Sequence, residues 1–272
     1  MTSPALQDIL ALFGCPAAGN PAQYLFERAI EAAGLDCRFL SFDVAPDRLA
    51  EALAGAAAMG FRGCLLSGPL RNAASPLVAA LSPAATFTGA VTLVERQPAG
   101  FIGHVTDGRG AAEALRSHLD LAGTRALILG AAAGGRATAL EVALAGAAEV
   151  LVCDPDAQRA EDLARSLADL DVRATTGTLP AAAVVDVPAT IDLVVIEAGD
   201  VKLGGLRGDL VVADLRLAAR TSAAATQAAE HGACIVSGIE IHAARAAIDF
   251  QMLTGTAADP DLLQDALDEF LS

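Results

Sequence analysis

Short apolar runs alternate with stretches of helical periodicity along almost the whole chain, and this alternation constrains the fold more than any other feature. Alternating strands and helices are typical of βαβ units, in which helices cover a parallel sheet. The pattern therefore predicts an α/β protein. We expect strands over residues 9–14, 37–44, 61–67, 88–106 (two strands turned at 97–100), 126–130, 149–154, 192–198, 209–215 and 233–237. We expect helices over residues 24–31, 46–59, 110–119, 157–168, 243–252 and 259–270.

The length and composition narrow the class of protein. A chain of 272 residues is long enough for two domains of ordinary size. No apolar run approaches the ~18 residues of a membrane span, and the N-terminus lacks the pattern of a signal peptide, so a soluble, cytoplasmic protein is expected. A net charge of −15 argues against nucleic acid as a partner. Nothing in the pattern decides between a monomer and a homodimer.

The cysteines and histidines show no spacing typical of a metal site or a catalytic triad. The five cysteines are dispersed, which favours reduced thiols. Cys64, Cys153 and Cys234 lie in apolar runs, where we expect them to be small buried hydrophobic residues. Three histidines have no partner at a suggestive spacing: His118, His231 and His242.

A glycine turn marks the second half of the chain. After the run 126–129, the turn consists of Gly130, Ala131, Ala132, Ala133 and Gly134, and a long helix follows it. Strand, glycine turn, helix and strand within about thirty residues predict a dinucleotide-binding unit. Ala132 stands where that pattern has its second glycine, so its methyl group would crowd a phosphate. A tight strand-to-helix turn in any α/β fold is the alternative.

Two aspartates follow the next strand. Asp154 lies some twenty residues past Gly130, where an acidic side chain accepts from ribose hydroxyls and repels a 2′-phosphate. The sequence therefore favours NAD over NADP as the cofactor. The alternative is that Asp154 or Asp156 caps the helix 157–168, and we expect Asp156 to be the cap.

Five segments carry a family resemblance: 12–44, 60–71 (GFRGCLLSGPLR), 89–94 (GAVTLV), 103–110 (GHVTDGRG) and 237–255. In this order and spacing they resemble the shikimate dehydrogenase family. The resemblance implies an N-terminal α/β substrate-binding domain (1–103, completed by 241–272) and a Rossmann-like doubly wound dinucleotide-binding domain (104–240). It also implies hydride transfer between the nicotinamide and a ring carbonyl or alcohol, with substrate in a cleft between the domains.

The resemblance maps the family's catalytic lysine to Arg71 and its catalytic aspartate to Asp107. Arginine does not release a proton near neutral pH, so acid–base work would pass to Asp107, a water or His104. Each position also has a structural interpretation. Arg71 would start a helix and point to water, and Asp107 would be a helix N-cap.

The substrate positions of the family are also altered. By the same resemblance, they fall on Asn20, Ala22, Ser67, Thr92, Val105, Thr106 and Arg245, of which only Thr106 matches the family residue. Arg71 and Arg245 would suit a small-molecule carboxylate, although a solvated helix residue is the alternative for Arg245. On the cofactor side, the family's Asn-Ala-Thr-Pro loop has become Ile196-Glu197-Ala198-Gly199, and Ala198 is a further candidate for cofactor contact.

Three functions remain open from the sequence. The first is an NAD(P)-dependent oxidoreductase acting on a cyclic hydroxy or keto carboxylic acid, with little activity on shikimate. The second is a catalytically inactive relative that binds a small molecule or a dinucleotide. The third is a scaffold without a dinucleotide, because Ala132 and Glu197 both intrude on the expected cofactor path. The fold alone does not choose among them.

Overall fold

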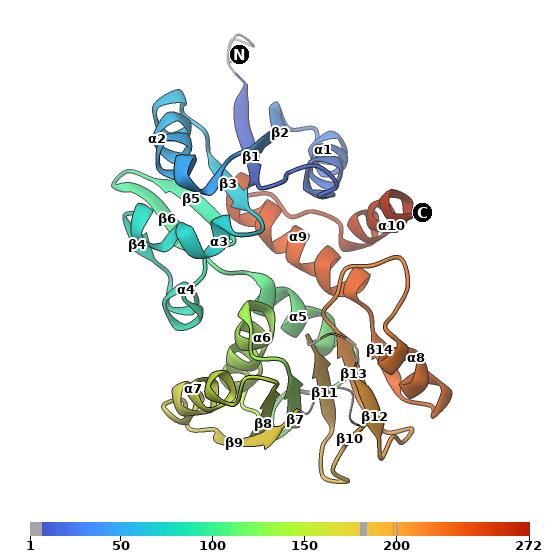
Figure 1. Ribbon diagram of the computed structural model, residues 1–272. Helices are drawn as coiled ribbons and strands as arrows, with labels where there is room; N and C mark the ends of the chain where they lie inside the picture. Colours follow the sequence, from blue (N-terminus) through green and yellow to red (C-terminus); the bar gives the residue numbers. More distant parts are fainter. Residues whose placement is uncertain (1–6, 180–183, 198, 200) are drawn as a thin grey trace. The chain divides into compact units, whose positions relative to one another are not determined.

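The computed structural model describes residues 7–179, 184–197, 199 and 201–272. Its internal contacts divide the chain into two compact units. The first unit comprises Met1–Thr106 and Arg245–Ser272, and the second comprises Asp107–Ala244. The long helix α9 (Gly238–Thr254) contributes to both (Figure 1).

The first unit is a mixed sheet covered by helices (Figure 1). Within the described residues its strand order is β2-β1-β3-β5-β6-β4, parallel for β1 with β2 and β3 and antiparallel for β5 with its neighbours β3 and β6. Its elements are β1 (Asp8–Gly14), α1 (Ala22–Ala33), β2 (Cys37–Asp43), η1 (Pro46–Arg48), α2 (Leu49–Met59), β3 (Gly63–Leu66), α3 (Leu70–Ala73), η2 (Ser75–Leu77), β4 (Ala80–Leu81), α4 (Pro83–Thr88), β5 (Leu93–Gln97), β6 (Gly100–His104) and α10 (Pro260–Leu271).

The C-terminal segment completes the core of this unit. Phe250 lies fully buried with its ring 5.6 Å from that of Phe26, which in turn lies 4.4 Å from that of Phe39. Three rings from α9, α1 and β2 therefore bury a large apolar area at one point. Three of the chain's few aromatic residues therefore pack the N-terminal part of this unit against its C-terminal segment.

The second unit is a parallel sheet with helices on its faces (Figure 1). In the described part of the chain, the sheet order is β14-β13-β11-β7-β8-β9, and every pairing is parallel. This is the doubly wound order of Rossmann-like domains. Its elements are α5 (Asp107–Arg116), β7 (Arg125–Leu129), α6 (Ala133–Leu144), β8 (Glu149–Asp154), α7 (Ala157–Ala168), β9 (Arg173–Thr178), β10 (Val184–Asp186), β11 (Leu193–Ile196), β12 (Lys202–Gly204), β13 (Val211–Asp214), α8 (Ala223–Glu230) and β14 (Cys234–Val236).

The α/β class predicted from the sequence is confirmed, with differences at particular elements. Helix α5 begins at Asp107, three residues before the expected start, and its Gly108 and Gly110 are buried. Strand β9 was not predicted, because its sequence RATTGT is polar at a sheet edge. Cys234 is exposed and not buried as expected, because it begins the edge strand β14. Among the described residues, no helix combines the length and the apolar character that crossing a membrane requires.

Candidate active site

The glycine turn lies where strand order reverses in the second unit. Strand β7 ends at Leu129 beside Ile196, the last residue of β11, and in open parallel sheets ligands bind at the carboxyl ends of two such strands. Gly130 has φ of 110°, which favours glycine. A Cβ on Gly135 would lie 2.1 Å from the carbonyl oxygen of Gly130, so Gly135 is the glycine that lets α6 pack on the turn. The predicted turn is thus formed as the sequence indicated.

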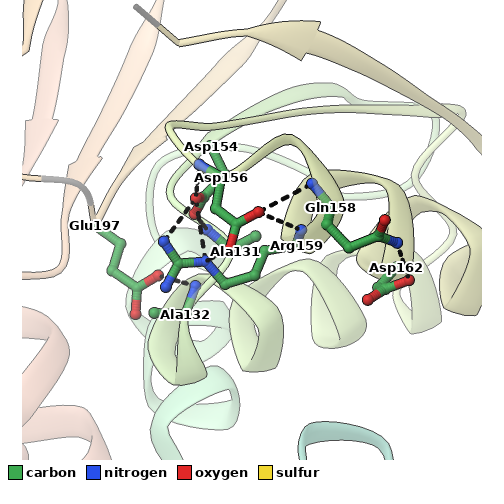
Figure 2. A network of polar contacts seen from close by, with 8 residues as sticks. All are labelled: Ala131, Ala132, Asp154, Asp156, Gln158, Arg159, Asp162 and Glu197. Carbon is green, nitrogen blue, oxygen red and sulfur yellow. Dashed lines mark hydrogen bonds and ion pairs between the residues drawn. The ribbon is translucent and has the colours of Figure 1, made fainter. Parts of the chain in front are cut away.

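The carboxylate of Glu197 occupies the start of helix α6. Its Oε2 accepts a hydrogen bond from the backbone N–H of Ala132 at 2.9 Å, and its Oε1 accepts one from Gly134 at 2.7 Å. Figure 2 shows the side chain reaching from the end of β11 toward Ala132. Free N–H groups and the helix dipole make a helix start an anion site, and here the anion is the chain's own side chain.

Burial raises the pKa of the Glu197 carboxyl above its usual value of 4.5. Backbone hydrogen bonds from Gly135, Gly134 and Ala132 oppose this by lowering the pKa, and the nearby charge of Asp107 raises it further. The carboxylate is therefore held by donors but poorly solvated. Asp107, which begins α5 in the same unit, is thus close enough for its charge to act on the Glu197 carboxyl.

Asp154 is buried and already engaged within the protein. Its Oδ2 accepts from the backbone N–H of Ala131 at 2.7 Å, and its Oδ1 accepts from the N–H of Asp156 at 2.8 Å. Arg159 donates to the same Oδ1 at 2.9 Å and is itself half exposed (Figure 2). Asp156 caps α7 through the N–H of Gln158, which confirms the cap expected from the sequence.

Two threonines predicted at the substrate site bond to each other in the first unit. The Oγ1 atoms of Thr92 and Thr106 lie 3.2 Å apart, and Thr92 Oγ1 also accepts from the Thr106 backbone N–H at 3.1 Å. Both residues are buried, so these hydroxyls join the end of β6 to the segment before β5. The structure brings these two candidates together.

The other substrate candidates of the first unit lie at strand ends. Arg71 is half buried in α3, and its Nε donates to the carbonyl oxygen of Leu66 at the end of β3, so the side chain folds back onto the sheet. Ser67 follows β3 directly and donates its backbone N–H to Phe13. Asn20 accepts from the N–H of Ala22 at the start of α1.

An open groove of about 580 Å³ lies beside Asn20 in the first unit. Its polar lining includes Gln23, Ser41 and Asp43, and Tyr24 and Phe270 add ring surface. Asp43 also accepts from the backbone N–H of Ala17. Arg71 and Ser67 do not line this groove.

Arg245 and His104 each have an acidic partner in the first unit. Arg245 Nε lies 3.4 Å from Asp249 Oδ2 one turn further along α9, and Asp249 is almost fully buried. The solvated alternative for Arg245 is therefore wrong, since its side chain is only 18% exposed. His104 Nε2 lies 3.3 Å from Glu95 Oε2 on the neighbouring strand.

One candidate lies outside the described residues, and one contact was missed. Ala198, expected near the cofactor, is not among the residues that the structure describes. The sequence flagged Glu197 as an intrusion but not as the partner of the glycine turn. The available signal was its place directly after β11, since the chain order of Rossmann-like strands puts that residue beside the turn.

A parallel sheet of this order with a glycine turn at its switch point defines a Rossmann-like α/β protein. Residues 12–94 match the family model described as the shikimate dehydrogenase substrate binding domain. The chain is 32% identical over 284 residues to the shikimate dehydrogenase (NADP(+)) of Citrifermentans bemidjiense, covering 98% of this chain and 97% of the relative. The chain belongs to the shikimate dehydrogenase family.

Two further comparisons show how far this likeness extends. The shikimate dehydrogenase (NADP(+)) of Moorella thermoacetica is 36% identical over 165 residues, which span 60% of this chain and only 56% of that enzyme. The crystal structure of the ligand-free 5-ketofructose reductase of Gluconobacter sp. strain CHM43 is similar with a TM-score of 0.92 and 28% identity, covering 97% of this chain and 99% of the other.

Proposed function

We propose that the chain is an oxidoreductase that moves hydride between a nicotinamide dinucleotide and a cyclic hydroxy or keto compound. The observation that carries the proposal is the group of backbone N–H donors at the start of α6, which converge on one carboxylate. A pyrophosphate is also an anion and suits the same donors. Ala132 holds an anion in spite of its methyl group, so this substitution alone does not remove the site.

The backbone N–H groups of Ala132 and Gly134, called the nest below, and the residues around them have defined roles in this proposal. Once Glu197 has left, the N–H groups of Ala132 and Gly134 would hold the pyrophosphate, and the bound dinucleotide would supply or accept the hydride. Asp154 at the end of β8 favours NAD, because its carboxylate repels a 2′-phosphate. Arg159 offsets part of that charge, so NADP, which the names of the relatives specify, is the second candidate.

On the substrate side, Arg71 and Asp107 take the places of the family's lysine and aspartate. The Arg71 guanidinium would stabilise negative charge on the reacting oxygen without releasing a proton, which leaves proton transfer to Asp107. Because Asn20, Ala22 and Arg245 replace groups that bind the family's substrate, we propose that shikimate itself is a poor substrate.

The test measures reduction of the oxidised cofactor by a panel of cyclic hydroxy acids that includes shikimate and quinate, and oxidation of the reduced cofactor by 5-ketofructose. Asp107→Asn should abolish turnover, because it removes the proton acceptor, while the variant should still bind dinucleotide. Failure of the whole panel, with both nucleotides and at several pH values, would argue against the proposal.

A catalytically inactive relative is the second candidate, and Glu197 is the specific observation that favours it. A side chain that occupies the nest competes with any dinucleotide, and Arg71 lacks the acid–base chemistry of lysine. This candidate predicts small-molecule binding without turnover. Activity of the wild-type chain on any member of the panel, lost in Asp107→Asn, would exclude it.

A further inference from the structure

A cysteine, a histidine and a glutamate from distant parts of the sequence meet in the second unit. Cys234 Sγ lies 3.3 Å from His118 Nδ1, and His118 Nε2 lies 2.8 Å from Glu240 Oε1. His118 follows α5, Cys234 begins the edge strand β14, and Glu240 lies in the first turn of α9. The spacing of His118 in the sequence gave no sign of these contacts, because the fold supplies both partners from about 120 residues away.

The geometry fixes which nitrogen of His118 carries the proton. A carboxylate only accepts hydrogen bonds, so Nε2 must donate to Glu240. In the neutral ring, Nδ1 is then the acceptor, and the thiol of Cys234 donates to it. A thiol is activated when it lies within hydrogen-bond reach of a base and a third group orients that base. Cys234, His118 and Glu240 have this arrangement.

Backbone contacts hold each of the three groups in place. The backbone N–H of Cys234 donates to the carbonyl oxygen of Leu210 at 2.9 Å, which fixes the start of β14. The N–H of Glu240 bonds to Ser237 Oγ at 3.2 Å, and the N–H of His118 donates to Leu115 at 2.9 Å. The side chains of His118 and Glu240 are each 27% exposed, which limits their freedom without closing the site to solvent.

Cys234 differs from the other four cysteines, all of which lie within the described residues. Cys37, Cys64 and Cys153 are buried, and burial raises the pKa of each thiol, that of Cys64 to about 12. Cys15 is half buried and belongs to the first unit. Cys234 alone among the five is exposed, so a reagent in solution reaches it directly.

We propose that Cys234 is a nucleophilic thiol that exchanges with small disulfides, with His118 as its base and Glu240 as the residue that positions His118. His118 takes the thiol proton, and the Cys234 sulfur attacks one sulfur of the disulfide. A new S–S bond forms between them while the original S–S bond breaks. The second half of the disulfide leaves as a thiolate and is reduced, and Cys234 becomes a mixed disulfide.

The test measures the reaction of the whole chain with dithiodipyridine, a neutral aromatic disulfide whose leaving group absorbs light. Mass spectrometry assigns each kinetic phase to a cysteine. We expect a fast phase at Cys234 that Cys234→Ser removes and that Cys15→Ser, the matched control in the other unit, leaves unchanged. His118→Asn should slow this phase at least about tenfold, as expected for loss of a general base.

Three further variants separate a base from a merely structural histidine. Added imidazole should restore much of the rate in His118→Ala, and Glu240→Asp should retain more of the rate than Glu240→Gln. The thermal midpoint and the rate at Cys15 report whether each variant is folded. A fast phase that persists in folded His118→Asn, or that belongs to Cys15, would overturn the proposal.

Discussion

Glu197 and Gly134, which lie 63 residues apart in the sequence, are joined by a 2.7 Å hydrogen bond from the backbone N–H of Gly134 to the Glu197 carboxylate. The same carboxylate accepts from Ala132, so one side chain fills the anion site that the glycine turn builds. By the resemblance of residues 196–199 to the family's Asn-Ala-Thr-Pro loop, an alanine would stand where this chain has Glu197. A dinucleotide must therefore compete with an internal anion for these donors.

The pH dependence of stability should report on Glu197. Because burial raises its folded-state pKa above 4.5, the folded protein binds more protons than the unfolded chain between 4.5 and the raised value. The free energy of unfolding should therefore fall as the pH rises through this window. Unfolding by urea at a series of pH values measures the slope, and Glu197→Gln should reduce it. An equal slope in the variant would mean that other groups control it.

Asp154 should contribute more to stability than the neighbouring helix cap. Asp154→Ala leaves the buried N–H of Ala131 without its acceptor, which costs about 1–3 kcal/mol, and it also removes the contact with Arg159. Asp156→Ala is the matched control and should cost about 1 kcal/mol as the loss of an N-cap. Urea unfolding compares the two, and a smaller effect at Asp154 would contradict the structural role.

Two glycine-to-alanine substitutions should act in opposite directions. A Cβ on Gly108 would lie 2.1 Å from the carbonyl oxygen of Ala137, so Gly108→Ala should force α5 from α6 and destabilise the chain by about 1–3 kcal/mol. A Cβ on Gly55 in α2 meets only Met59 at 3.9 Å, and Gly55→Ala should stabilise by about 0.5–1 kcal/mol. Thermal unfolding gives both values. If Gly108→Ala did not lower the thermal midpoint, the close approach at Gly108 would be relieved at little cost.

Local sequence signals predicted most of the fold and only part of the site. The strands around 126–129 and 149–154, the turn at Gly130 and the cap at Asp156 each depend on neighbouring residues, and the sequence therefore indicated them. Strand β9 was missed because a polar edge strand lacks the apolar pattern.

The contacts that the sequence did not predict join residues far apart along the chain. Glu197 reaches Gly134, and Cys234 reaches His118, only because the doubly wound order brings their strands and helices together. Asp154 was interpreted as a ribose ligand from its position alone. Its bonds to Ala131 and Arg159 depend on how β7, β8 and α7 pack, which single-sequence patterns do not specify.

Whether Glu197 occupies the cofactor's place is tested by comparing the dinucleotide affinity of the wild-type chain with that of Glu197→Ala, which carries the residue that the family resemblance puts there. Calorimetric titration with NAD and with NADP should give binding at least about tenfold tighter in Glu197→Ala, since a hydrogen-bonded charged competitor worth about 1.5 kcal/mol or more is gone. In the wild type, binding should also tighten as the pH falls toward the raised pKa of Glu197, and the variant should lose this dependence. Equal or weaker binding in a folded Glu197→Ala would contradict the claim that Glu197 occupies the cofactor's place.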